Sequence, residues 1–248
     1  MTKTIGIHSF RRSTGKTFFA GNLSILLAQQ GWRVGLVDTD FHSPNLHNMF
    51  GFSPEEVPLT LNEFLNAQCD AKQIVYDVTE RLPQLTGQVY LLPASSNHDE
   101  ITKMLRQGYS VEKLAEALRQ ISQTYALDAI VMDTSAGLTE ENLRALALAD
   151  SVAIVMLPDQ QHYQGTAVMT DLARQLHIAS VSLVVNQVPD IYDPAQVKRE
   201  IEEKYNTPVT AVLPFVEECG TCDQFFVLEF PAHPLTVNLM EVALGVLK

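Results

Sequence analysis

The sequence predicts an α/β fold built on one doubly wound, mainly parallel sheet. Seven short apolar runs rich in Val, Ile and Leu recur along the 248 residues, and each is nearly continuous, as in strands buried on both faces of a parallel sheet. Longer segments with helical spacing separate most of these runs, which favours right-handed βαβ crossovers. No internal repeat or linker divides the sequence, so we predict a single domain over residues 1–248. The predicted strands are Thr4–His8, Val34–Val37, Val89–Leu92, Ala129–Met132, Val152–Met156, Ser182–Val185 and Val209–Leu213.

The segments between the strands predict helices with recognisable ends. Thr17–Gln30 is followed by Gly31, a residue type that often terminates helices. Val111–Tyr125 carries apolar residues on one face and charged residues on the other. Residues 41–88 contain four prolines and predict only short helical pieces. The remaining predicted helices are Glu140–Ala149, Gln164–Leu176, Pro194–Tyr205 and a core-packing C-terminal helix over Pro234–Lys248.

The composition is that of an acidic globular protein. Apolar residues make up 46% and charged residues 19%, which is sufficient for a full core. The formal net charge of −12 argues against a constitutive, strongly basic nucleic-acid binder. Three cysteines and no recognisable export signal favour a cytoplasmic protein without a disulfide framework. The C-terminal segment has one lysine and one glutamate, so we expect no electrostatic attraction to an anionic membrane.

A strand, a short loop and a helix start follow one another around Gly15-Lys16-Thr17. Phosphate binding requires this order, because N–H groups of the loop and of the first helical turn then point at the anion. In such a site Lys16 would reach the β- and γ-phosphates, and the Thr17 hydroxyl would ligate Mg²⁺. Phe10 occupies the first glycine position of G-x-x-x-x-G-K-[ST], so only the second half of that motif is present. The alternative is a surface turn with a solvated lysine, but the place after the first strand favours a ligand site.

Several motifs in the correct order resemble those of the ParA/MinD ATPases. Arg11–Thr17 resembles the deviant Walker A box of that family, K-G-G-x-G-K-[ST]. Val34–Asp40 resembles its Walker A′ strand and switch I, and Ala129–Leu138 resembles its Walker B strand and switch II. The resemblance spans residues 4 to about 240 and implies a P-loop NTPase architecture with ATP and Mg²⁺ as ligands. Smaller matches are Val89–Ser95, Val184–Asn186 and Val212–Phe215.

Three aspartates follow predicted strands. Asp38 and Asp40 are two residues apart, so they project to the same side if the strand geometry persists. Two carboxylates beside a triphosphate repel it unless Mg²⁺ lies between them. The resemblance implies that Asp40 positions or activates the attacking water, that Asp38 supports Mg²⁺ and that Asp133 contacts Mg²⁺ through water. The alternative for Asp38 is to cap the following turn or helix.

The loop departs from the family pattern at three positions, of which Arg12 and Ser13 replace both loop glycines. Arg11 replaces the signature lysine, which in the family reaches across an ATP-sandwiched dimer to the partner's phosphates. Arginine keeps the charge and adds a planar fork suited to phosphate, so we interpret Arg11 as a catalytic trans contact with slower or differently regulated hydrolysis. The alternative is an arginine that only faces solvent. The resemblance places Arg12, Ser13, Thr14, Gly15, Lys16, Thr17 and Phe18 around the phosphates, and Asn186 and Pro214 at the adenine.

The resemblance implies a Mg·ATP-dependent dimerising ATPase switch that positions or partitions a cargo. The cargo would be a plasmid, a chromosome, the division site or a protein compartment. The ATP state would be a homodimer, and a partner or adaptor protein would stimulate a slow ATP hydrolysis. Lys198, Arg199 and Lys204 suggest nonspecific DNA binding and nucleoid association, but a solvated helix face alternating with glutamates is the favoured alternative.

Two other functions stay open. Cys219 and Cys222 form a CxxC, and one such pair per chain gives a dimer the four thiolates that a [4Fe–4S] cluster needs. That would make the chain an Fe–S carrier ATPase, whereas two incidental cysteines on one helical turn is the alternative. A metabolic ATP-dependent ligase of the same superfamily is the other possibility, with a second substrate pocket in residues 41–88.

Overall fold

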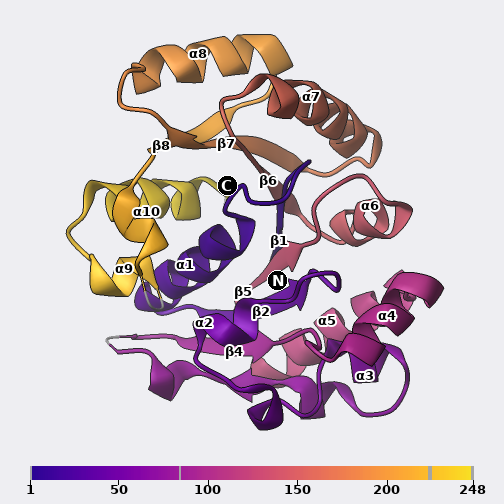
Figure 1. Ribbon diagram of the computed structural model, residues 1–248. Coiled ribbons are helices and arrows are strands. Elements are labelled where there is room, and N and C mark those ends of the chain that lie inside the picture. Colours follow the sequence, from indigo (N-terminus) through magenta and orange to yellow (C-terminus); the bar gives the residue numbers. More distant parts are fainter. Residues whose placement is uncertain (1, 84, 223–224, 247–248) are drawn as a thin grey trace.

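The computed structural model describes residues 2–83, 85–222 and 225–246, and an eight-stranded sheet lies at its centre (Figure 1). The strand order is β3-β4-β2-β5-β1-β6-β7-β8. Only the β3–β4 pair is antiparallel among the paired strands of the described chain. The doubly wound, mainly parallel sheet predicted from the sequence is confirmed. The strands are β1 (Lys3–His8), β2 (Arg33–Thr39), β3 (Tyr76–Asp77), β4 (Gln88–Leu92), β5 (Ala129–Thr134), β6 (Ser151–Met156), β7 (Ser180–Val188) and β8 (Val209–Pro214).

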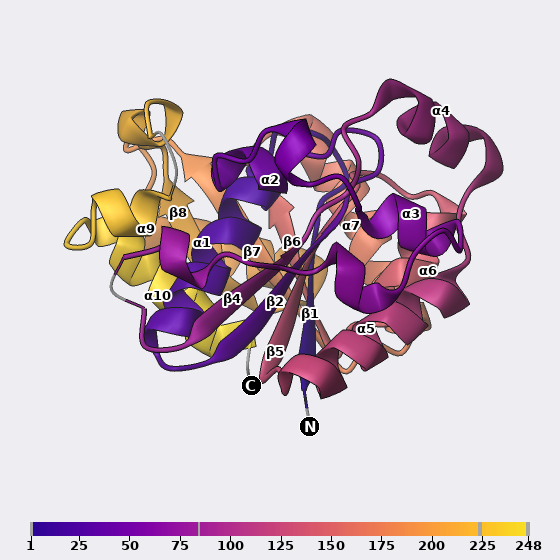
Figure 2. The same cartoon turned by 90° about the horizontal axis from the view of Figure 1, so that it is seen from below.

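Helices cover both faces of the sheet, as the view in Figure 2 shows. One face carries α1 (Lys16–Gln29), α9 (Phe226–Glu229) and α10 (Pro234–Val246). The other carries α5 (Val111–Tyr125), α6 (Glu140–Leu146), α7 (Gln160–Gln175) and α8 (Pro194–Tyr205). The remaining helices are α2 (Leu46–Met49), α3 (Leu61–Leu65) and α4 (His98–Gln107), and the 3₁₀ turns are Pro54–Glu56, Ala71–Ile74, Thr79–Arg81 and Glu217–Gly220.

The helix ends follow from local hydrogen-bond chemistry. Ser110 caps α5 by accepting from the Lys113 N–H, and Asp193 caps α8 just before Pro194. Gly31 has φ 89°, as expected for a glycine that follows the C-cap of α1. All predicted helices are present; α7 begins four residues earlier than predicted, and α6 ends earlier. The last predicted residues of the C-terminal helix, 247–248, lie outside the described residues.

The strand β3 and the helices α4 and α9 were not predicted. β3 is two residues long and pairs antiparallel with β4, so it is too short to show an apolar alternation. α4 was missed although Ile101, Met104 and Leu105 have helical spacing, and only Met104 of the helix is buried. Its start is fixed by Asn97, whose side chain accepts from the N–H groups of Asp99 and Glu100.

The carboxyl ends of β1, β2, β5 and β7 point to the same edge of the sheet, where ligands bind in open α/β folds. α10 packs against α1 and β8 through buried residues such as Leu239 and Val242, as predicted for a core-packing helix. In the described ranges no helix has both the length and the apolar composition to cross a bilayer.

Candidate functional site

The loop that joins β1 to α1 has two residues in the left-handed backbone region. Ser13 has φ 62° and Gly15 has φ 93°, a conformation that costs residues other than glycine about 1–2 kcal/mol. Gly15 is required for a second reason, because a Cβ atom there would lie 2.7 Å from Asn186 Nδ2. The Asn186 amide donates to the Thr14 carbonyl at 2.8 Å. The end of β7 therefore supports this loop directly.

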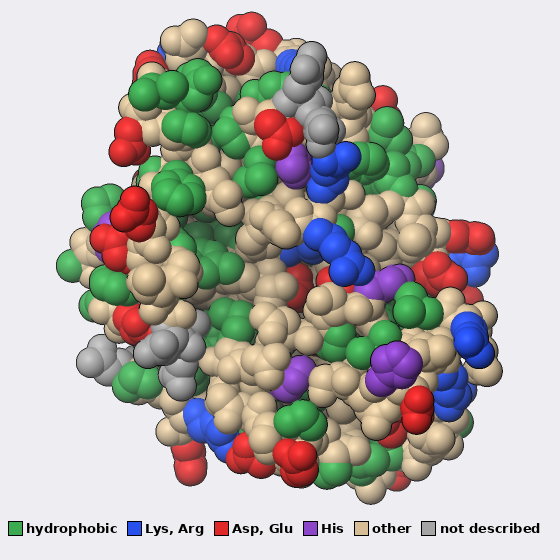
Figure 3. All heavy atoms as spheres, in the orientation of Figure 1, with side chains coloured by type: hydrophobic (Ala, Val, Ile, Leu, Met, Phe, Trp, Pro, Cys, Tyr) green, Lys and Arg blue, Asp and Glu red, His purple; other side chains and the backbone are tan. Residues whose placement is uncertain are grey.

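Three cationic side chains lie on or beside the loop. Arg11 and Arg12 are exposed, and Figure 3 shows Lys and Arg side chains beside the hollow in the middle of this face. Lys16 is only 6% exposed. Burial lowers the pKa of its amine, while the nearby carboxylates of Asp133 and Asp40 raise it. A buried lysine amine with two exposed arginines in front of it suits an anion that enters the loop with its charged end first.

Thr17 and Asp133 meet at the carboxyl edge of the sheet. Thr17 Oγ1 donates to Asp133 Oδ2 at 2.6 Å. The other oxygen, Asp133 Oδ1, is buried and has no hydrogen-bond partner among the described residues. Burial raises the pKa of this carboxyl to about 7, although the Thr17 hydrogen bond and the Lys16 charge lower it. A hydroxyl beside an unpartnered carboxylate oxygen is a donor set that fits Mg²⁺.

Asp38 lies next to Asp133, because the two residues are register partners on β2 and β5. Its Oδ1 accepts from the Asp40 N–H at 3.0 Å. Its Oδ2 accepts from the N–H groups of Asn45 at 3.1 Å and Leu46 at 3.2 Å. Burial and the adjacent Asp133 charge raise the Asp38 pKa well above its usual value. These hydrogen bonds favour the capping role at the start of α2, and the Mg²⁺ role of Asp38 stays a prediction.

Asp40 ties together the segments that follow β2 and β5. β2 ends at Thr39, so the strand alternation that would place Asp38 and Asp40 on one side stops between them. Asp40 Oδ1 accepts from Ser135 Oγ at 2.9 Å and from the His42 N–H at 3.2 Å. Ser135 was not predicted as a functional residue. Its only sequence signal is its place two residues after Asp133.

The segment after β5 is also bonded to β1 and its loop. The Gly137 N–H donates to the Ser9 carbonyl at 3.0 Å. Thr134 Oγ1 donates to the Ile7 carbonyl at 2.8 Å and lies 2.7 Å from His8 Nδ1. Thr134 therefore accepts from His8 Nδ1–H, and burial lowers the His8 pKa to about 3, so this imidazole is neutral. The loop, β1 and the segment after β5 form one hydrogen-bonded unit.

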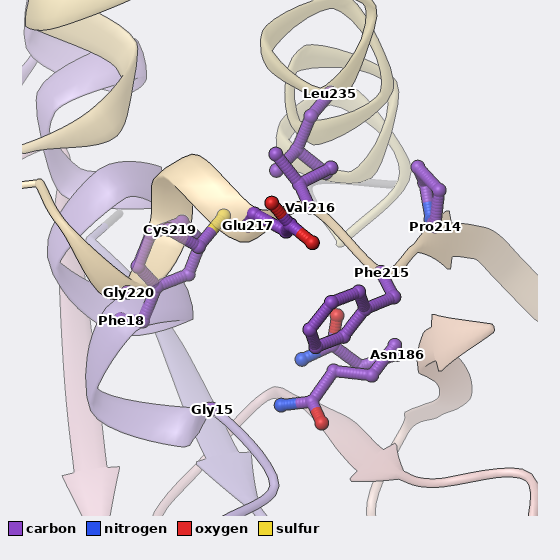
Figure 4. Close-up of a pocket in the computed structure, with 11 residues that line it drawn as sticks. Gly15, Phe18, Asn186, Pro214, Phe215, Val216, Glu217, Cys219, Gly220 and Leu235 are labelled. Atoms are coloured by element: carbon purple, nitrogen blue, oxygen red, sulfur yellow. The ribbon is translucent and has the colours of Figure 1, made fainter. Parts of the chain in front are cut away.

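A pocket of about 280 Å³ opens beside the loop (Figure 4). Asn186 and Pro214, both predicted at the adenine, line it together with Gly15 and Phe18. Phe215, which is 56% exposed, lies near Asn186 in this view. The structure thus brings the loop and the ends of β7 and β8 to one concave, mainly apolar site, as a base pocket requires. Its other lining residues are Gln187, Val216, Glu217, Cys219, Gly220 and Leu235.

The chain resembles known proteins along nearly its whole length. It is 27% identical over 246 residues to an uncharacterized ATP-binding protein of Methanocaldococcus jannaschii, covering 98% of this chain and 87% of that protein. It is 27% identical over 218 residues to the septum site-determining protein MinD of Synechocystis, covering 86% of this chain and 76% of that protein. The solved structure of the septum site-determining protein MinD of Pyrococcus horikoshii, complexed with Mg-ADP, matches with a TM-score of 0.82 at 23% identity. That match covers 99% of this chain and 96% of the other.

A protein-family model described as an AAA domain matches residues 2–183, from the start of β1 into β7. The chain belongs to this family, as a ParA/MinD-type P-loop ATPase. The resemblance read from the motifs is therefore confirmed at the level of the family.

The CxxC of this ParA/MinD-type chain lies at the wall of the pocket beside the loop. Cys219 is in the 3₁₀ turn Glu217–Gly220 and lines the pocket, whereas Cys222 follows that turn. Cys222 Sγ lies 3.1 Å from Glu229 Oε1. Burial and the Glu218 charge raise the Cys219 pKa to about 11, so this thiol is protonated. Within the described ranges, no three His, Cys, Asp or Glu side chains are grouped as metal ligands. The Fe–S role therefore stays a prediction that needs a second chain.

The predicted DNA-binding residues lie on α8, and part of residues 41–88, where a ligase pocket was predicted, lines a hollow. Lys204 on α8 lies over the Tyr163 ring, with Nζ 4.1 Å from the ring centroid, while Lys198 and Arg199 are exposed. A second hollow of about 490 Å³ is lined by Pro54–Glu63 on one side and Ala94–Glu100 on the other. Both functions stay predictions.

The protonation of Asp133 makes the stability of this ParA/MinD-type chain depend on pH. The folded-state pKa of about 7 lies above the ordinary value of 3.8, so the folded protein loses stability as the pH rises from about 4 to 7. We expect Asp133→Asn to be more stable than the parent in metal-free buffer. The difference should grow by about 2–3 kcal/mol between pH 5 and pH 8.

Urea unfolding at both pH values in EDTA measures this difference. Asp171→Asn is the control, because the Asp171 side chain is 69% exposed and should leave the pH profile unchanged. A pH-independent difference for Asp133→Asn would show that this carboxyl is already ionised in the fold.

Proposed function

We propose that this chain binds Mg·ATP at the loop between β1 and α1 and acts as an ATP-dependent dimerising switch that positions a cargo. The observation that carries the proposal is the unpartnered, buried Asp133 Oδ1 beside the Thr17 hydroxyl and near the Lys16 amine. The adjacent base pocket supports a nucleotide over a simple anion. The relatives add support, since one is described as ATP-binding and another is complexed with Mg-ADP.

The residues of the site divide the work of phosphoryl transfer. Lys16 and the N–H groups at the start of α1 bind the β- and γ-phosphates. Thr17 and Asp133 hold Mg²⁺, which neutralises charge on the phosphate oxygens. Asp40, fixed by Ser135, orients a water molecule for attack on the γ-phosphate. Asn186 and Pro214 contact the base.

Two hydrogen bonds give the switch a physical basis. Asp40 links the segment after β2 to Ser135, and Gly137 links the segment after β5 to the loop at Ser9. A γ-phosphate that attracts these segments reorders them together, and its loss on hydrolysis releases them. The reordered surface binds a second ATP-bound copy, and a partner protein accelerates hydrolysis. Relatives named as septum site-determining proteins support a positioning role.

Light scattering coupled to size-exclusion chromatography tests the switch. We expect a dimer with ATP and Mg²⁺, and a monomer with ADP or without nucleotide. A chain whose mass does not respond to nucleotide would contradict the proposal. The purified protein should also be colourless. Visible absorption by an Fe–S cluster would instead favour the Fe–S carrier alternative.

Arg11→Ala tests the trans contact within the dimer. Arg11 is exposed at the rim of the loop, where a second copy can meet it. Losing a charge-assisted contact of about 1.5–3 kcal/mol should weaken ATP-dependent dimerisation roughly 10- to 100-fold while ATP binding to the monomer changes little. Analytical ultracentrifugation measures the dimerisation. Arg199→Ala on α8 is the matched control, and unchanged dimerisation in Arg11→Ala would reject the trans role.

A further inference from the structure

Gly165 occupies the middle of α7, where glycine is unfavourable. A glycine inside a helix costs about 1 kcal/mol relative to alanine, so its presence there needs a reason. The backbone supplies none, because Gly165 is not among the described residues with positive φ. The reason is space. A Cβ atom at position 165 would lie 1.9, 2.1 and 2.4 Å from Cδ1, Cγ and Cε1 of Phe10.

The three closest atoms thus belong to one ring, and that ring comes from the phosphate loop. Phe10 stands at the position where G-x-x-x-x-G-K-[ST] has its first glycine. Its own φ is not in the left-handed region, so the backbone tolerates a side chain there. The ring is partly buried and packs on the core layer beneath α7. In Figure 1 the indigo loop runs toward α7, in agreement with this contact.

Phe10 separates a fixed part of the loop from its exposed part. Before it, Ser9 is fully buried and its carbonyl accepts from the Gly137 N–H. After it, Arg11 and Arg12 are exposed and Ser13 has the left-handed φ of 62°. A loop with a strained residue and two long side chains needs an anchor near its start. The Phe10 ring against Gly165 is placed to be that anchor.

We propose that Gly165 is a positioning residue for the nucleotide: it forms a notch on α7 that seats Phe10 and thereby holds the Arg11–Ser13 segment over the phosphates. The inference rests on the proposed nucleotide binding at this loop. It also explains how the chain tolerates phenylalanine at a glycine position, since side-chain packing on α7 replaces a tight glycine turn. The lack of a side chain at position 165 leaves the space that the Phe10 ring occupies.

A double-mutant cycle with Phe10→Ala and Gly165→Ala tests this role. The dissociation constant of a fluorescent ATP analogue (mant-ATP) with Mg²⁺ is measured for all four proteins, together with the urea unfolding midpoint without nucleotide. We expect Gly165→Ala to weaken mant-ATP binding at least about 30-fold, because the new methyl group displaces the ring. Phe10→Ala alone should weaken it about 5-fold. The double variant should match Phe10→Ala within 2-fold, since without the ring the methyl group meets no obstacle.

Gly245→Ala is the matched control. A Cβ at position 245 in α10 would lie 2.5 Å from Thr210 Cγ2, so this variant also introduces crowding into a helix. It should lower the unfolding midpoint and leave the mant-ATP dissociation constant unchanged. If Gly165→Ala does not fold, a folded double variant still identifies the ring as the obstacle. The comparison of Phe10→Ala with wild type then decides the positioning role.

The outcomes separate this inference from the proposed function. If wild type binds mant-ATP and all folded variants bind it equally, Gly165 has only a structural role and the inference is wrong. If the double variant binds as weakly as Gly165→Ala, the ring is not the cause and the inference is also wrong. If wild type itself does not bind mant-ATP, the proposed function fails first, and the positioning role fails with it.

Discussion

Lys16→Ala is expected to weaken the binding of Mg·ATP about 100-fold. The amine is buried near Asp133 and Asp40, so it meets a phosphate in a poorly solvated place where a charge-assisted contact contributes about 1.5–3 kcal/mol. A second effect adds to this loss. The Lys16 charge lowers the Asp133 pKa, so its removal leaves that carboxyl more fully protonated at neutral pH and less able to hold Mg²⁺.

Isothermal titration with ATP in the presence of Mg²⁺ measures the effect of Lys16→Ala. Lys198→Ala is the control, because it removes an exposed lysine from α8 without altering the site. Raising the pH from 7 to 8.5 should restore part of the Mg²⁺-dependent binding in Lys16→Ala by ionising Asp133. A dissociation constant within 2-fold of the parent value would show that the loop does not hold phosphate through this lysine.

Asp40→Ala is expected to lower the rate of ATP hydrolysis about 100- to 1,000-fold while ATP affinity stays within a few-fold. Asp40 accepts hydrogen bonds from Ser135 and from the turn at His42, whereas the Thr17 hydroxyl is bound to Asp133. Its loss therefore removes the group proposed to orient water and spares the residues proposed to hold Mg²⁺. The ATP-bound dimer should accumulate, because binding continues and release does not.

A phosphate-release assay and light scattering in ATP together measure both effects of Asp40→Ala. Ser135→Ala is the informative companion variant, because it removes one anchor of the carboxylate and keeps the carboxylate itself. We expect a loss of about 10-fold in hydrolysis for Ser135→Ala. If both variants lose activity equally, Asp40 acts by ordering the loop. If Asp40→Ala hydrolyses ATP normally, another group orients the water.

The sequence predicted the sheet well because its strands are buried on both faces. A run such as Ala129–Met132 has no solvent-facing residues, so it stands out from the amphipathic segments around it. β3 and α4 were not predicted, because few of their residues are buried. β3 is too short for a pattern, and α4 is fixed by the Asn97 cap more than by burial.

The residues of the candidate site were predicted where they belong to a sequence motif. They were missed where contacts between segments distant in the sequence bring them together. Lys16, Thr17 and Asp133 lie together as the motifs indicated. The prediction that Asp38 and Asp40 lie on the same side assumed that the strand continues through Asp40. β2 ends at Thr39, so the two carboxylates have different hydrogen-bond partners. Cys219 was noted only as part of a CxxC, and the short 3₁₀ turn Glu217–Gly220 after β8 brings it to the pocket wall.

The two outer strands of the sheet determine how copies of this chain can associate. β3 offers only two residues, which is too short to template another strand, and β8 ends at Pro214, which has no N–H to donate. Pairing with a strand of another copy is therefore discouraged at β3 and at the end of β8. Crowded copies of this protein should remain discrete particles, and any larger assembly should grow through helix or loop surfaces.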